Sequence, residues 1–393
     1  MQPVTSDDSV LRLLDASLEH LHAPGLFDVH THVGANDPDG LKQSEDELLA
    51  VLDFVSPSTR AVTFPMHEPD GYPEHNDRVI EIARRAQGRI VAFCRLDPRS
   101  SPVAEAERCL DAGAVGIKLH PRAERFTLSE PEVRPIFALA HERQVPLIIH
   151  AGRGIPALGR DAVAFCREFP QASVILAHAG ICDLAWIWRE AAHLRNLYFD
   201  TAWWNPADMA ALFALVPAGN ILFGSDAPYG QTAYGAVRDL RFARQIGYRD
   251  EQIIAICGGQ LDRILAREEP ADLGPPPGPD RLPHDPLLAR IQIWLTTTAM
   301  AALRGNDYEE PMAITRLACA VGDDAPQADI CRTILTLLDA AEGEISAAKE
   351  LDDRAAGVVR RPGLRPLMAA TILAATPDVP VPPPPADAPH PQR

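Results

Sequence analysis

Cysteine gives this chain no framework for cross-linking. Seven cysteines are scattered over 393 residues without a Cys-x-x-Cys pair, and their number is odd. A disulfide-stabilised secreted protein would show an even set with regular spacing. The sequence therefore favours a reducing compartment, which we take to be the cytoplasm.

Positive charge is also in short supply. Lys and Arg number 37 against 54 Asp and Glu, which gives a formal net charge of -17. A nucleic-acid partner would require a basic excess to neutralise phosphates, and an anionic membrane surface would repel such a chain. We therefore expect a small-molecule substrate, with no nucleic-acid or membrane partner.

Long apolar runs are missing as well. No uninterrupted apolar stretch reaches the ~18 residues of a membrane span. Residues 1–8 are acidic and lack the basic start of a secretory signal. Residues 9–21 instead have the periodicity of an amphipathic helix, which predicts an N-terminal helix within residues 1–25.

The chain does contain eight short apolar runs separated by helical patterns. The runs are continuously apolar, as strands buried on both faces of a parallel sheet are, and cover 26–32, 61–67, 90–97, 114–120, 145–150, 173–178, 197–203 and 221–226. Between them, helical spacing covers 75–86, 103–112, 133–143 and 160–169. Eight strand–helix repeats predict an α/β fold, a (β/α)8 TIM barrel over residues 26–268. A doubly wound open sheet is the alternative.

Proline separates the barrel from the remainder of the chain. Seven prolines between 269 and 286 cannot continue a helix or a central strand, so we predict a semi-rigid linker. Residues 287–376 have helical apolar stripes, typical of a small all-α domain of three to five helices. The Pro-rich tail, residues 377–393, is predicted to be extended and disordered.

Metal-ligand residues stand at the carboxyl ends of the apolar runs. His30 and His32 end the first run, and alternate residues of a strand project to the same side, so both imidazoles can reach one ion. His150, His178 and Asp226 close three other runs. The carboxyl ends of barrel strands converge on one mouth, so the five side chains should lie close together there. Their nitrogen and oxygen donors then predict a metal site. Burying them together without an ion would be costly.

Five motifs give the chain a resemblance to a known family. They are Asp28-Val29-His30-Thr31-His32, Gly116-Ile117-Lys118-Leu119-His120-Pro121, His150-Ala151-Gly152, His178-Ala179-Gly180 and Gly224-Ser225-Asp226-Ala227-Pro228. With them the sequence resembles the amidohydrolase superfamily, in its amidohydrolase-related branch, over residues 26–267. The motifs are specific for the superfamily and poorly specific for substrate.

The resemblance implies a ligand set. His30, His32 and Asp226 would hold one divalent ion, with His150 added in single-metal members, and Asp226 would accept a proton from the bound water. His178 would polarise the substrate or bind a second ion with His150. Nitrogen and oxygen donors around an open position create metal-bound hydroxide near neutral pH. The ligand types favour Zn²⁺, as one or two ions, with Mn²⁺ or Fe²⁺ as alternatives.

Lys118 has two interpretations. In two-metal relatives a lysine on this strand is carboxylated by CO2 and bridges the ions, so the resemblance makes Lys118 a candidate metal ligand. The alternative is a lysine that pairs with Asp226 or with a substrate carboxylate. An unmodified ammonium beside a dication is electrostatically unfavourable.

Four further residues are candidates for substrate binding. Arg153 follows the strand-five histidine and could clamp a carboxylate or phosphate, a surface ion pair being the alternative. His120 shares a face with Lys118, His67 ends the second run, and Trp203 could form an aromatic wall. A purely structural role is the alternative for each.

Three functions compete. The first is a metal-dependent hydrolase of a C–N or C–O bond in an amide, lactam, lactone or ester. The second is a nonoxidative decarboxylase of an aromatic or unsaturated acid, a class that this branch contains. The third is a non-catalytic scaffold with a helical interaction module, against which the intact ligand set weighs. The helical domain could cover the mouth, form a homo-oligomer or recruit a partner.

Overall fold

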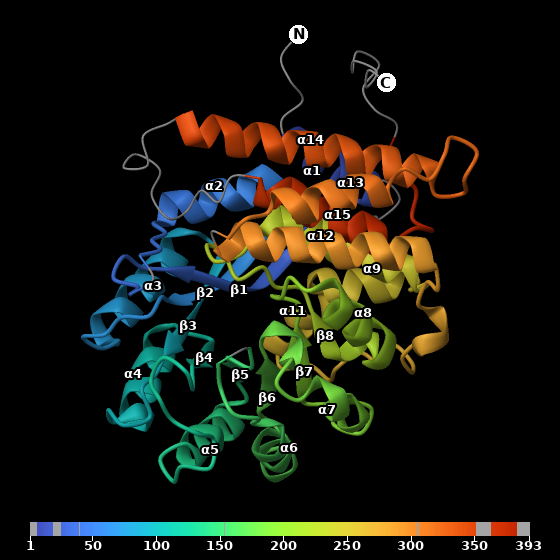
Figure 1. Ribbon diagram of the computed structural model, residues 1–393. Helices are drawn as coiled ribbons and strands as arrows, with labels where there is room; N and C mark the ends of the chain where they lie inside the picture. The colour runs from blue at the N-terminus through green and yellow to red at the C-terminus, as the bar shows by residue number, and fades with distance from the viewer. Residues whose placement is uncertain are drawn as a thin grey trace.

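The computed structural model describes residues 6–18, 25–38, 40–152, 154–304, 306–350 and 363–382. Eight strands form one sheet in chain order, each parallel to its neighbour. They are β1 (Phe27–Val33), β2 (Arg60–Pro65), β3 (Ile90–Arg95), β4 (Gly116–Leu119), β5 (Pro146–Ile149), β6 (Ser173–Leu176), β7 (Leu197–Asp200) and β8 (Ile221–Leu222). Figure 1 shows the strands following one another around a central axis.

The first and last strand segments close the sheet into a barrel. The backbone amide of Val29 donates to the carbonyl of Phe223 at 2.9 Å, and that of Asp226 donates to the carbonyl of His30 at 2.8 Å. The prediction of a TIM barrel is therefore confirmed, and the doubly wound alternative is wrong.

The strands are shorter at their carboxyl ends than predicted. β2 ends at Pro65, β3 at Arg95 and β7 at Asp200, and β8 covers two residues instead of six. Beyond these points the backbone leaves the extended region, as at Asp226, whose φ of 62° is incompatible with a strand. The predicted runs of 61–67, 90–97, 197–203 and 221–226 were therefore wrong at these ends.

Helices alternate with the strands around the outside. They are α2 (Glu45–Val55), α3 (Pro73–Arg85), α4 (Pro102–Ala112), α5 (Arg134–Arg143), α6 (Gly159–Glu168), α7 (Leu184–Ala191), α8 (Pro206–Leu215), α9 (Thr232–Gln245), α10 (Asp250–Ile254) and α11 (Gln260–Leu265). The four predicted helices are confirmed to within two residues. Local chemistry sets their starts, as where the Asn205 side chain accepts the amides of Ala207 and Asp208 at the start of α8.

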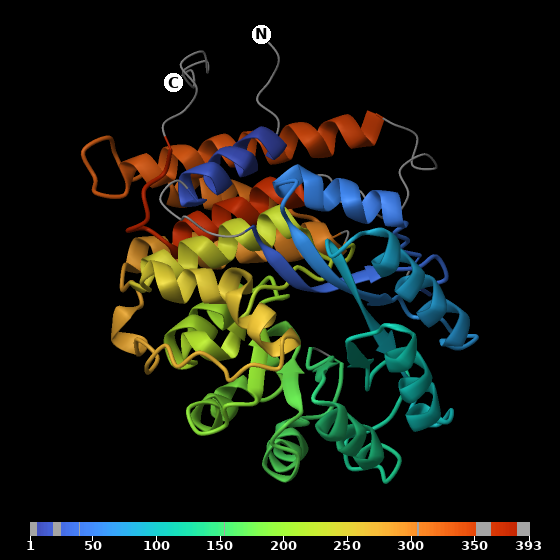
Figure 2. The same ribbon diagram turned by 180° about the vertical axis from the view of Figure 1, so that it is seen from behind.

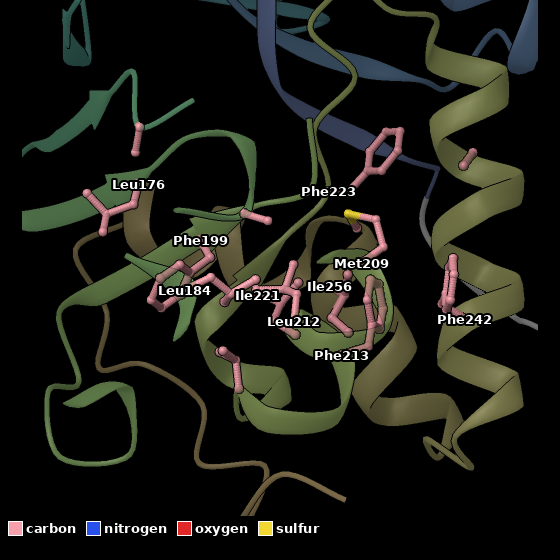
Figure 3. Close-up of a cluster of buried hydrophobic side chains, with 14 of the residues drawn as sticks. Leu176, Leu184, Phe199, Met209, Leu212, Phe213, Ile221, Phe223, Phe242 and Ile256 are labelled. Atoms are coloured by element: carbon pink, nitrogen blue, oxygen red, sulfur yellow. The ribbon is translucent and has the colours of Figure 1, made fainter. Parts of the chain in front are cut away.

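Two layers of apolar side chains hold the barrel together. Inside it, Phe27, Val29, Ile148 and Ile175 belong to one buried cluster. A larger cluster lies between the sheet and the helices. Figure 3 shows a part of this cluster, with the labelled residues Leu176, Leu184, Phe199, Met209, Leu212, Phe213, Ile221, Phe223, Phe242 and Ile256. Burial on both faces explains why the strands read as continuously apolar.

Four helices follow the barrel: α12 (Pro286–Arg304), α13 (Glu309–Ala318), α14 (Ala328–Glu350) and α15 (Leu364–Ala375). Figures 1 and 2 show them as a layer along one side, over the N-terminal α1 (Ser6–Leu18) and over α9. Leu240 of α9 and Leu367 of α15 belong to the same buried cluster. The apolar core is thus continuous between the barrel and this helical layer.

The predicted linker and residues 377–382, the described start of the predicted tail, lie against the barrel. In the first, Gly278 donates to the carbonyl of Ala214, and Leu273 accepts from the Gln252 side chain. At the start of the tail, residues 377–382 are ordered, and Asp378 bonds to Gln245 of α9. The predicted disorder does not extend to these six residues, because α9 offers them polar partners. Residues 383–393 lie outside the described residues.

Two expectations from composition can be compared with the structure. All seven cysteines are free thiols, as their odd number and spacing predicted. Among the described ranges, no helix combines the length and the apolar character needed to cross a bilayer.

Candidate metal centre

The predicted ligand residues gather at the carboxyl ends of the strands. His30 and His32 lie on β1, and Lys118 lies on β4. His150 directly follows β5, and His178 opens a short 3-10 turn after β6 (η1, His178–Gly180). These segments are far apart in sequence and meet because parallel strands of a barrel end at one mouth.

Two imidazoles converge on one carboxylate oxygen. His30 Nε2 lies 3.2 Å and His32 Nε2 lies 3.1 Å from Asp226 Oδ1. Neighbouring ligands of a tetrahedral ion with bonds of 2.0–2.1 Å lie about 3.3 Å apart. The ligand atoms of His30, His178 and Asp226 also lie within 4.8 Å of one another. The donor types and their spacing therefore fit a divalent cation, and we call this position the metal seat.

Burial prepares these groups to bind a cation. It lowers the pKa of His30 and His32 well below the usual value, and the nearby Lys118 lowers both further. Both imidazoles are therefore neutral near pH 7, with a lone pair available. Burial raises the pKa of Asp226, against the opposing effect of Lys118. A cation in the seat would favour the ionised carboxylate.

Asp200 at the end of β7 orients two of the histidines and was missed in the sequence. Its Oδ2 accepts from His30 Nδ1 at 2.7 Å, which directs Nε2 of His30 toward the seat. Its Oδ1 accepts the backbone amide of His178 at 2.7 Å. The sequence analysis passed over Asp200 because it lies inside the predicted run 197–203, although the strand itself ends at this carboxylate.

The remaining histidines form a chain of contacts. His178 Nδ1 donates to the carbonyl of Ala202 at 2.6 Å, which leaves Nε2 as the acceptor. Nε2 of His178 lies 3.0 Å from Nδ1 of His150, which is then the donor. The ring of His120 stacks on that of His150 with centroids 3.9 Å apart. The stacking brings His120 to the mouth, and its contact with substrate stays a prediction.

Lys118 is fully buried beside the seat. Its Nζ lies 3.2 Å from His30 Nε2 and 4.5 Å from the centroid of the Phe64 ring. Burial lowers the pKa of Lys118 to about 7, although Asp226 and Asp200 act in the opposite direction. A large fraction of the amine is therefore neutral at physiological pH, which is the form that reacts with CO2 or accepts a proton.

The predicted substrate residues have different positions. Trp203 is half-buried, with its ring centroid 6.2 Å from that of His178, and its Nε1 donates to Asp208 at 2.6 Å. His67 is half-buried in the loop after β2, and within the described ranges no hydrogen bond connects it to the seat. Arg153 lies outside the described residues.

Two further buried carboxylates around the mouth, Asp28 and Glu124, were not predicted from the sequence. Asp28 accepts the amides of His30 at 3.0 Å and of Ser225 at 2.9 Å, and so ties β1 to the segment that carries Asp226. Buried Arg95 pairs with Glu124 at 2.8 Å. Neither carboxylate ends an apolar run, so neither gave the signal that marked the predicted ligands.

The comparisons with known proteins can now be set beside this geometry. A family model described as Amidohydrolase matches residues 27–259, more than half of the chain. The chain belongs to the amidohydrolase family. Among curated proteins no match is found.

Solved structures show the same fold as this amidohydrolase at low sequence identity. The 5-carboxyvanillate decarboxylase of Sphingomonas paucimobilis is 17% identical with a TM-score of 0.50, and the match covers 62% of this chain and 99% of that one. The dihydroxybenzoic acid decarboxylase of Polaromonas sp. JS666, with bound manganese and the inhibitor 2-nitroresorcinol, is 15% identical with a TM-score of 0.50, over 62% and 97% of the two chains.

Proposed function

We propose that this amidohydrolase is a metal-dependent enzyme that decarboxylates a small aromatic or unsaturated carboxylic acid without oxidation. The observation that carries the proposal is the position of Lys118, buried with its Nζ 3.2 Å from a nitrogen of the metal seat. Hydrolysis of a C–N or C–O bond, the first expectation from the sequence, becomes the second candidate.

The charge of the mouth favours an anionic substrate. When Lys118 is protonated, one divalent ion and the ammonium together carry one positive charge more than the carboxylates of Asp200 and Asp226. The adjoining Arg95–Glu124 pair is neutral as a whole. A substrate carboxylate would neutralise the excess charge, and it would relieve the repulsion between the ammonium and the ion. The two structural neighbours named as decarboxylases agree with this assignment.

The residues have separate roles in the proposed reaction. His30, His32 and Asp226 would hold the ion, with His150 as a further ligand. The bound ion would supply Lewis-acid stabilisation of negative charge on the substrate. Lys118 would hold the substrate carboxylate, with Arg153 as a second cation and His67, His120 and Trp203 as surrounding contacts.

The reaction itself requires one proton. The bond between the carboxylate and its carbon breaks, CO2 leaves, and the electron pair stays on that carbon, which takes up a proton. His178 Nε2, an acceptor in the neutral ring, would first take a proton from His150 Nδ1, 3.0 Å away. The imidazolium so formed would deliver that proton from Nε2 to the carbon, since its Nδ1 stays bonded to the Ala202 carbonyl.

Hydrolysis is favoured by a different observation. His150 Nδ1 and His178 Nε2 lie 3.0 Å apart, close to the spacing of two ligands of one ion. With Lys118 carboxylated, they could hold a second ion, whose added positive charge the carbamate would partly offset. Asp226 would then accept a proton from the attacking water. Such a mouth would suit a neutral amide, lactam, lactone or ester.

The identity of the ion is part of the proposal. The nitrogen and oxygen donors suit Zn²⁺, Mn²⁺ or Fe²⁺. Mn²⁺ gains support from the manganese in one structural neighbour, so both Mn²⁺ and Zn²⁺ belong in the test.

One experiment separates the two reactions. The protein, loaded with Mn²⁺ or Zn²⁺, is incubated with aromatic and unsaturated acids labelled with ¹³C at the carboxylate, and in parallel with uncharged aryl esters, amides and lactones. We expect ¹³CO2 from at least one acid, and its loss in Asp226→Asn. His178→Gln should retain the ion but lose the CO2 release. Turnover confined to the uncharged panel, with a carbamate carbon on Lys118 in the ¹³C spectrum, would replace decarboxylation by hydrolysis.

A further inference from the structure

A buried ion pair on α9 takes no part in the metal seat. Arg238 Nε lies 2.7 Å from Asp239 Oδ1, and their side chains are 9% and 3% exposed. Buried ion pairs of this kind contribute little to stability, because desolvation of both charges offsets their attraction. Their burial beside the segment that follows β7 therefore calls for a different role.

The pair contacts the segment that follows β7. Arg238 Nη1 donates to the backbone carbonyl of Trp203 in a short hydrogen bond. The carbonyl of the preceding residue, Ala202, accepts from His178 Nδ1 at 2.6 Å. The guanidinium and the imidazole thus hold consecutive carbonyls of one short irregular segment.

Charge on the pair strengthens this contact. Burial raises the pKa of Asp239 to about 6, while Arg238 and the Thr201 hydroxyl lower it. Asp239 is therefore ionised at neutral pH and fixes the orientation of the guanidinium plane. A hydrogen bond from a charged donor contributes about 1.5–3 kcal/mol, roughly twice that of a neutral one.

The Trp203 indole also donates to Asp208 of α8, whereas the backbone amides of the segment have local partners. The Ala202 amide donates to Asp200 Oδ1 at 3.0 Å, and the Trp203 amide donates to Thr201 O at 2.6 Å. Both bonds are local, within three residues. The bond from α9 is the one that ties the Trp203 carbonyl to a long helix of the barrel.

We propose that Arg238, held by Asp239, is a positioning residue for His178. By fixing the Trp203 peptide, it keeps the Ala202 carbonyl where it binds Nδ1 of His178, so that Nε2 of the imidazole faces the seat. The consequence for turnover rests on the proposed function. The consequence for the His178 hydrogen bond holds whichever reaction the site performs.

The exchange of the His178 Nδ1 proton with water tests the geometry directly. In ¹⁵N-histidine-labelled, Zn²⁺-loaded protein, this proton is assigned by its absence in His178→Gln. Loss of a charged hydrogen bond of about 1.5 kcal/mol or more should accelerate exchange about tenfold or more in Arg238→Met. Asp239→Asn should produce a smaller acceleration, and Arg238→Lys, which keeps one charged donor, should restore much of the protection.

The matched control is Arg244→Gln on the same helix. Arg244 pairs with Asp250 at 2.6 Å on the surface, so its loss should change exchange less than twofold while it removes an α9 arginine. If Arg238→Met does not fold, Arg238→Lys and Asp239→Asn decide the question. Unchanged exchange in the folded variants would overturn the proposal, even if CO2 release is observed.

An activity measurement then tests the consequence. Once a substrate is identified, Arg238→Met should lower kcat about 10–100-fold, as expected for a group that orients a catalytic ligand, with KM changed less than about threefold. A change in KM alone would contradict positioning of His178. Absence of any turnover in wild type would count against the proposed function and leave the exchange result as the test of this inference.

Discussion

The mouth of the barrel and the C-terminal helical layer are both well buried, but they bury different chemistry. Within the described ranges, the layer and its carboxyl end bury polar side chains only as threonines, each donating to a carbonyl of its own helix: Thr298, Thr315, Thr371 and Thr376. The mouth buries imidazoles, carboxylates and an ammonium, among them His32, Lys118 and Asp200.

The mouth and the helical layer also differ in which residues have a positive φ angle. At the mouth, non-glycine residues hold positive φ, with 57° at His178 and 62° at Asp226. In the described part of the helical layer, positive φ occurs at glycines, Gly322 and Gly363. Strained backbone and buried charge both cost stability, and such costs concentrate where a site is preorganised. The comparison indicates that the layer contributes stability while the mouth contributes chemistry.

The largest expected effect is the loss of stability on truncating a core side chain of the helical layer. Leu373 of α15 is fully buried in the cluster shared with the barrel. We expect Leu373→Ala to lower the free energy of unfolding by about 2–5 kcal/mol, from lost burial and the cavity left behind. Urea unfolding would measure it, with exposed Leu317→Ala as control. The metal affinity of the folded variant should stay within about threefold of the wild-type value. A larger loss would contradict the separation of stability in the layer from metal binding at the mouth.

Removing the carboxylate behind His30 should act on the mouth alone. In Asp200→Asn the amide cannot accept from both His30 Nδ1 and the His178 amide with the strength of a carboxylate. We expect metal affinity to fall about 10–100-fold, as measured by Mn²⁺ titration calorimetry. Asp262→Asn, which breaks a half-exposed pair with Arg60, should leave affinity unchanged. Equal affinities in the two variants would exclude a role of Asp200 in orienting the ligands.

The buried lysine should give ion-free protein an unusual pH dependence. Burial lowers the pKa of Lys118 from 10.5 to about 7. Between these values the unfolded chain binds more protons than the folded one, so stability should rise with pH by at most about 1.4 kcal/mol per unit. Urea unfolding in chelator at pH 7.5 and 9 would show this slope in wild type relative to Lys118→Met. Parallel behaviour of the two proteins would mean that Lys118 stays protonated in the folded protein over this pH range, and would contradict its lowered pKa.

The smallest effect concerns a helix start beside the mouth. The Asn205 side chain accepts two amides at the start of α8, directly after Trp203 and Trp204. Asn205→Ala should lower stability by about 1 kcal/mol, measured by thermal or urea unfolding. Retention of the full metal affinity would show that loss of a local cap does not reach the seat.

Much of the fold could be predicted because strands of a parallel barrel are buried on both faces and are therefore continuously apolar in sequence. Continuous apolar runs with helical spacing between them sufficed for eight strands, and for four helices to within two residues. The strand ends could not be predicted, since residues such as Asp226 continue an apolar run in sequence while their backbone turns away. That turn depends on contacts such as the bond from the Asp226 amide to His30 O.

The residues of the candidate site also fall into two groups, those that the sequence pattern predicted and those that it did not. His30, His32, His150, His178 and Asp226 end apolar runs, and the structure gathers the runs at one mouth. Asp28 and the Arg238–Asp239 pair gave no signal because none of them ends an apolar run. The contacts that suggest their roles, with Ser225 and Trp203, come from distant segments. The packing of α15 against α9 could not be predicted either. An amphipathic pattern indicates that one face of a helix is buried, but it does not identify the element that covers that face.

Metal content tests the central claim most directly. The chain is purified without chelator, supplemented with Mn²⁺ or Zn²⁺, desalted and measured by elemental analysis, beside Asp226→Asn. We predict about one ion or more per chain in wild type and a loss of most of it in the variant. Less than about 0.1 ion per chain in folded wild-type protein, or equal content in both proteins, would contradict the assignment of a metal seat.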